Sequence, residues 1–176
     1  MKLKLEFRSQ LQSIRSIAKR NLAFEGLSDE DKRKEIAYDC LKLTLQGKVR
    51  GAYNSYWSSS LDCIKEPDSK KFQKLLVDDL PECAVCVRGG MMLSQIRLGN
   101  SLSTNSHSYY KGDYENIKGF TFDSFIKMED EYENLHYHHP YNTDTTEKLQ
   151  NICLNVIHNG DFDVDDATDY VSKCIV

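Results

Sequence analysis

The stretch "PECAVCVRGGMMLSQIRLGN", residues 81–100, decides the fold that the sequence predicts. Pro81 opens it, a Gly-Asn pair ends it, and apolar residues fill the part between them. It therefore predicts a buried central helix over residues 82–98. Because glycine weakens a helix interior, Gly89 and Gly90 indicate that another helix or a ligand approaches this face closely.

On both sides of this stretch, apolar residues recur at spacings of three and four, which is typical of amphipathic helices. Toward the N-terminus they predict a helical hairpin over residues 2–47, with Ser28 as the N-cap of its second helix. Toward the C-terminus they predict helices over residues 120–175. Two segments lack such a stripe, and for them we predict a short irregular or β segment near residues 49–61 and a long loop at 101–119.

Length and composition are those of an ordinary globular chain. The 176 residues are 40% hydrophobic and 28% charged, which is enough apolar content for one domain with its own core. We predict a mainly α fold, a single helical domain over residues 1–176 built as a bundle of about six to seven helices. The formal net charge of −4 argues against direct nucleic-acid binding.

The sequence also predicts where the protein works. It contains no run of about 18 apolar residues that would form a transmembrane helix, and its N-terminus lacks the apolar region of a secretory signal. We therefore expect a cytoplasmic protein without a membrane partner. In a reducing compartment the six cysteines are expected to be free thiols.

The spacing C-x-x-C at Cys83 and Cys86 raises two chemical alternatives. It is half of a structural zinc site, which His136 and His138 would complete if they lie near it in space. It is also the spacing of thiol redox motifs, but those follow a buried strand, and no such strand is predicted before residue 83. We favour a third interpretation, in which both cysteines are small buried core residues.

Other catalytic signatures are incomplete. "DFDVDDATDYVS", residues 161–172, has aspartates at four positions of a calcium-binding loop but lacks its glycine and its final glutamate. No hydrolase, metalloprotease or phosphate-loop motif occurs. We therefore assign no catalytic residue and no cofactor, and a small metal-dependent enzyme remains an alternative.

Two groups of aromatic and polar residues are candidates for partner binding. Aromatic side chains with polar ends are favoured in binding surfaces, and long polar loops are often functional. The first group lies in the segment near 49–61 and the second in the predicted loop: Tyr53, Tyr56 and Trp57, then His107, Tyr109, Tyr110 and Lys111. Arg88 and Arg97 are candidate donors for a small anionic ligand such as a nucleotide.

Two short segments resemble a family of small uncharacterised proteins from bacteriophages and their bacterial hosts. The matching residues are Cys83, Cys86, Gly89, Leu93, Ser94, Ile96 and Arg97, then Asn155, Ile157, Asn159, Gly160 and Phe162. The resemblance implies a phage accessory protein in the cytoplasm of a bacterial host cell. It carries no established activity, and such proteins often bind a host protein, a defence-system component or its nucleotide signal.

Together these features favour a non-enzymatic binding protein that inhibits a host or bacterial-defence factor. The alternatives are a protein that sequesters a small anionic nucleotide signal and the small metal-dependent enzyme. Acidic helical proteins also form homo-oligomers, but the sequence specifies no symmetry.

Overall fold

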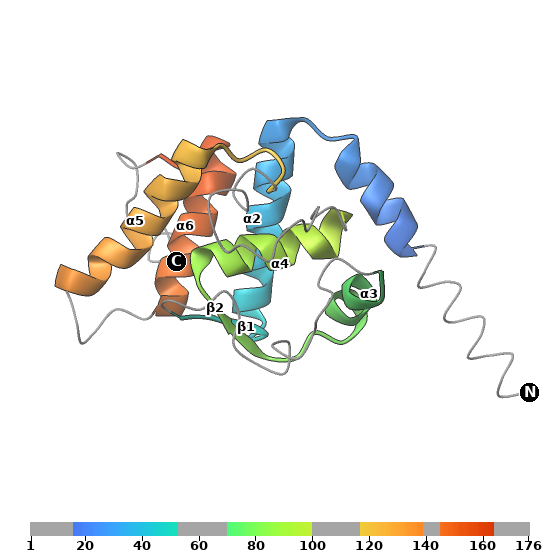
Figure 1. The fold of residues 1–176 in the computed structure, drawn as a ribbon, viewed down its shortest axis with the longest axis horizontal. Coiled ribbons are helices and arrows are strands. Elements are labelled where there is room, and N and C mark those ends of the chain that lie inside the picture. Colours follow the sequence, from blue (N-terminus) through green and yellow to red (C-terminus); the bar gives the residue numbers. More distant parts are fainter. Residues whose placement is uncertain (1–15, 53–69, 100–116, 139–144, 164–176) are drawn as a thin grey trace, which may run out of the picture.

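The computed structural model describes residues 16–52, 70–99, 117–138 and 145–163. Most of them are helical, so the predicted mainly α fold is confirmed. The elements follow in chain order (Figure 1): a helix over residues 16–25, α2 (Asp29–Leu45), β1 (Val49–Gly51), α3 (Lys70–Asp78), β2 (Cys83–Val85), α4 (Val87–Gly99), α5 (Phe122–His138) and α6 (Thr145–Asn159).

Helix α2 begins where the sequence predicted. The backbone N–H of Asp31 donates to Ser28 Oγ at 3.1 Å, which satisfies one of the free amides of the first turn. Asp29 and Glu30 add negative charge at the positive end of the helix dipole. Gly47 follows the helix with a φ of 68°, a left-handed conformation that glycine adopts without strain.

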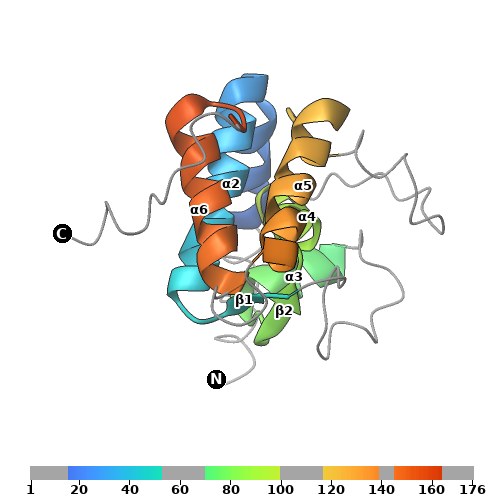
Figure 2. The ribbon, with the colours of Figure 1, turned by 90° about the vertical axis from the view of Figure 1, so that its left-hand side faces the viewer.

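The core is built around α2, α4 and α6. Helix α2 packs most extensively against α6 and also against α4. Figure 2 shows α2 and α6 side by side, and Figure 1 shows α4 crossing α2. The side chains of Ile36, Cys40, Leu93, Leu149 and Cys153 are almost wholly buried between these helices, so their apolar area stabilises the fold.

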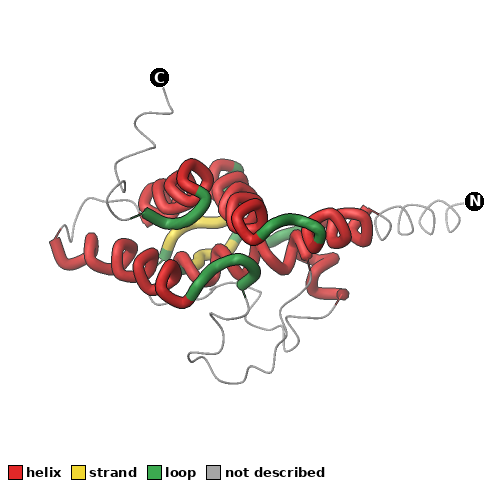
Figure 3. The backbone as a smooth tube through the Cα atoms, turned by 90° about the horizontal axis from the view of Figure 1, so that it is seen from above, coloured by secondary structure: helices red, strands yellow, loops and turns green. Residues whose placement is uncertain are grey.

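The central helix differs from its prediction at its start. Residues 83–85 form the short strand β2, which pairs in parallel with β1, and α4 begins only at Val87. The register pairs Val49 with Cys83, and Figure 3 shows the strands with helices on either side. Two parallel strands need a crossover connection. Here the connection between β1 and β2 contains α3. Strand β1 agrees with the β segment predicted near 49–61.

The helix over residues 16–25 is joined to α2 through residues 26–28. In Figure 1 the two helices diverge from this connection. The side-chain amides of Asn21 and Gln73 hydrogen-bond to one another, which ties the first helix to α3. Four predicted segments lie wholly or partly outside the described residues: the start of the hairpin (1–15), most of the irregular or β segment (53–61), most of the long loop (101–116) and the last helix (164–176).

Candidate functional site

The two cysteines of the C-x-x-C spacing are separated by a strand. Cys83 is the first residue of β2, and Cys86 follows the last residue and precedes α4. Three residues of extended chain span about 10 Å, more than the roughly 7 Å limit between Cα atoms for a disulfide. Side chains an odd number apart also point to opposite faces of a strand. The strand therefore separates the two thiols, which a helix would have placed on one face.

Each of these thiols has a structural environment. Burial raises the pKa of Cys83 to about 11. Cys86 Sγ accepts a hydrogen bond from the backbone N–H of Gly89 at 3.4 Å and so caps the N-terminus of α4. Burial raises the pKa of Cys86 even though this hydrogen bond lowers it. Reactive thiols have a lowered pKa, so both cysteines are held as neutral thiols. Cys83 is buried in the core, as we predicted, whereas Cys86 is only partly buried against it.

The other half of the suggested zinc site belongs to α5. His136 and His138 lie near the C-terminal end of this helix, and their side chains are outside the described part of the chain. Within the described residues, no group of three or more His, Cys, Asp and Glu side chains is arranged to hold a metal ion.

Arg88 forms an ion pair with α5. Its Nη2 atom lies 2.6 Å from Glu129 Oε2, and the two side chains are 11% and 20% exposed. Burial raises the pKa of the Glu129 carboxyl, although the Arg88 guanidinium lowers it. This candidate ligand donor therefore holds α4 against α5.

Arg97 links three helices. Its Nε donates to Asp39 Oδ2 of α2 at 2.8 Å, and its Nη1 donates to the backbone carbonyl of Leu76 in α3. Arg88 and Arg97 lie nine residues apart on α4, which corresponds to about 13.5 Å along a helix. They do not converge on one pocket, and each binds groups of the fold itself.

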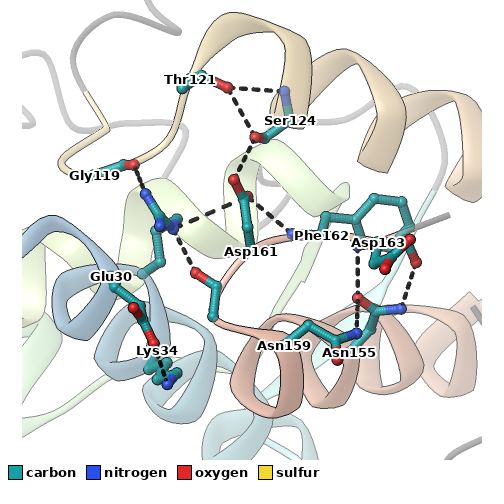
Figure 4. Close-up of polar contacts among 12 residues, drawn as sticks. Glu30, Lys34, Gly119, Thr121, Ser124, Asn155, Asn159, Asp161, Phe162 and Asp163 are labelled. Atoms are coloured by element: carbon teal, nitrogen blue, oxygen red, sulfur yellow. Dashed lines mark hydrogen bonds and ion pairs between the residues drawn. The ribbon is translucent and has the colours of Figure 1, made fainter. Parts of the chain in front are cut away.

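The second segment of the resemblance shapes the turn after α6. Asn155 Nδ2 donates to the backbone carbonyl of Asp163 at 2.8 Å, and the N–H of Asp163 donates to Asn155 Oδ1 at 2.9 Å (Figure 4). Gly160 has a φ of 78°, which favours glycine, and Phe162 is buried. These matching residues have structural roles in this chain.

Arg33 binds the same turn from α2. Its Nε donates to the carbonyl of Gly160 at 2.6 Å, and its Nη1 donates to the carbonyl of Gly119 at 2.5 Å. Asp161, the first aspartate of the calcium-like segment, accepts from Ser124 Oγ at 3.0 Å and from the backbone N–H of Phe162. Figure 4 shows this network joining α2 to the segments before α5 and after α6.

Both groups proposed for partner binding lie outside the described residues: Tyr53, Tyr56 and Trp57, and His107, Tyr109, Tyr110 and Lys111. The described residues show a different surface, on the outer face of α2. Tyr38 is 57% exposed and Leu45 is 68% exposed. This surface was not predicted, although the sequence carries a signal for it, because both residues fall off the buried stripe of α2.

A second feature missed from the sequence is a hollow beside the two-stranded sheet. It has a volume of about 370 Å³ and is lined by Gly47, Arg50, Glu82, Cys83 and Ala84. These residues come from segments more than thirty positions apart, and only the pairing of β1 with β2 brings them together. No local spacing in the sequence could have indicated it.

The comparisons with known proteins give no further assignment: no protein-family model, curated protein or solved structure matches the chain. In the part of the chain that the structure describes, no helix is both long enough and apolar enough to cross a membrane.

Proposed function

We propose that this protein acts by binding another protein and has no catalytic chemistry of its own. The observation that carries the proposal is the exposure of Tyr38 and Leu45 on α2. They lie seven residues apart, or about two helical turns, so they occupy the same face. Buried residues such as Ile36 and Cys40 occupy the opposite face.

This face has the composition of a recognition surface. Exposed apolar residues that gather on one helix face often mark a protein interface, and tyrosine is enriched among the residues that dominate binding energy. Lys34 and Lys42 lie on the same side of α2, at positions 34 and 42, beside Tyr38. Asp31 and Glu35 are exposed on this side too, and Lys34 pairs with Glu30. The partner therefore needs an apolar groove with polar groups at its rim.

A finer proposal concerns the partner. The resemblance to proteins of bacteriophages and their hosts favours a host or bacterial-defence protein that is inhibited by the contact, in the cytoplasm of a bacterial cell. Support for this step comes from the resemblance alone.

A capture experiment tests the proposal. The immobilised full chain is incubated with a bacterial lysate, and bound proteins are identified by mass spectrometry for the wild type, for Tyr38→Ala combined with Leu45→Ser, and for Leu22→Ser. Leu22 is 77% exposed on the helix over residues 16–25, so Leu22→Ser is the matched control. We expect a partner that the wild type and the control both capture and the double variant loses.

The affinity for the purified partner should then fall about tenfold or more in the double variant, as for residues that dominate an interface. Thermal melting of all three chains shows whether they fold alike. If the double variant captures every protein that the wild type captures, the outer face of α2 is not the recognition surface and the proposal fails.

A further inference from the structure

The hollow beside the sheet lies over the face that turns away from the core. Val49 and Cys83 form a register pair and are both buried, while Arg50 pairs with Ala84. Because side chains alternate along a strand, Arg50 and Ala84 share the outer face. Ala84 has only a methyl group and is itself buried, so the exposed residues that line the hollow are Gly47, Arg50 and Glu82.

The turn after α2 leaves the hollow open at one end. Gly47 lines it, and a Cβ atom built at this glycine would meet no atom within 4 Å. The volume of about 370 Å³ lies within the range of small-molecule sites, roughly 300–1,000 Å³.

Two charged residues line the hollow, Arg50 and Glu82. Arg50 faces Ala84 and forms no ion pair within the described chain. The described arginines that lie between helices, by contrast, bind carboxylates or backbone carbonyls of the fold.

We propose that this hollow binds a small anion through the guanidinium of Arg50. The ligand class is an organic molecule with a phosphate or carboxylate group, because a planar guanidinium binds either group through two parallel hydrogen bonds. The site is separate from the outer face of α2 and does not depend on the proposed protein partner.

The test titrates the full chain with inorganic phosphate and, separately, with glutarate at fixed ionic strength. Backbone amide shifts in ¹⁵N-resolved spectra report binding, and we expect the largest changes at Gly47 and Ala84. Arg50→Gln should weaken binding and raise the dissociation constant about tenfold or more. Glu82→Gln removes an opposing carboxylate and should tighten binding about two- to fivefold.

Lys42→Gln is the matched control, because it removes one exposed positive charge from α2 at a position that does not line the hollow. It should leave the dissociation constant unchanged. A response to phosphate alone or to glutarate alone supports the site and identifies which group it prefers. The proposal is overturned if Lys42→Gln weakens binding as much as Arg50→Gln does, or if neither probe shifts Gly47 or Ala84 at millimolar concentration.

Discussion

At the scale of single residues, Gly90 explains how α4 approaches α2 so closely. A Cβ atom at this position would lie 2.9 Å from Cys40 Sγ and 3.4 Å from Val85 Cγ2. The Cys40 thiol is itself fixed, because it is buried and hydrogen-bonds to Cys153 on α6, and both effects raise its pKa. The close contact that the two glycines predicted is therefore made, at Gly90, by another helix.

We predict that Gly90→Ala lowers the free energy of unfolding by about 1–3 kcal/mol, because the clash outweighs the gain in helix propensity. In a Cys40→Ala background the sulfur is absent, so the same change should be neutral or stabilising. Urea unfolding of the four chains gives the coupling between the two positions. Gly26→Ala, where the nearest atom is 3.6 Å from the added Cβ, should cause no loss. Equal costs of Gly90→Ala in both backgrounds would show that the sulfur is not the obstacle.

At the scale of elements, the parts that sequence predicts are those with local signals. Ser28 predicted the start of α2, because its hydroxyl caps an amide only three residues away. Helix α6 was predicted from an apolar stripe that includes Leu149 and Ile152. Strand β2 was missed because its three apolar residues also fit a helix, and its pairing with β1 connects positions 34 residues apart. The ion pairs of the two arginines on α4 could not be predicted for the same reason, since their carboxylates lie 41 and 58 residues away.

Arg33 provides the prediction at this scale, because it attaches two connecting segments to α2. Arg33→Ala leaves the carbonyls of Gly119 and Gly160 without their donor, which should cost about 1–3 kcal/mol in the free energy of unfolding. Arg33→Lys should recover little, because a single ammonium cannot reproduce the fork of donors. Hydrogen exchange should accelerate at amides 117–122 and 158–163 before it does in α4.

Lys32→Ala is the control for this prediction, since it removes a neighbouring positive charge from the same turn of α2. It should leave exchange in both segments unchanged. If Arg33→Ala accelerates exchange uniformly across the described helices, Arg33 supports the fold as a whole and does not act on these two segments in particular.

At the scale of the whole molecule, α4 joins the other helices into one body. It packs against α2, α3 and α5, and its two ends carry the partly buried arginines. Because Arg97 binds Asp39 on α2 and the carbonyl of Leu76 on α3, the loss of one helix would leave polar groups of the others unpaired. We therefore expect these helices to unfold together in one cooperative transition.

The last prediction is that Arg97→Ala destabilises the whole molecule. Removing one partner of a partly buried ion pair leaves Asp39 desolvated and unpaired, which should cost about 2–4 kcal/mol. Adding Asp39→Ala should recover part of this loss. Lys34→Ala breaks the exposed pair with Glu30 and should cost less than about 0.5 kcal/mol.

Urea unfolding followed both by far-ultraviolet circular dichroism and by the nuclear magnetic resonance signals of the α3 backbone amides distinguishes this global effect from a local one. For Arg97→Ala we expect the two midpoints to fall together, because the side chain connects three helices and its loss weakens all of their contacts with α4. A cost no larger than that of Lys34→Ala would mean that the ion pair only breaks even against desolvation. Separate midpoints would mean that α3 detaches alone, and Arg97 would then be a local tether and not a link that makes the fold cooperative.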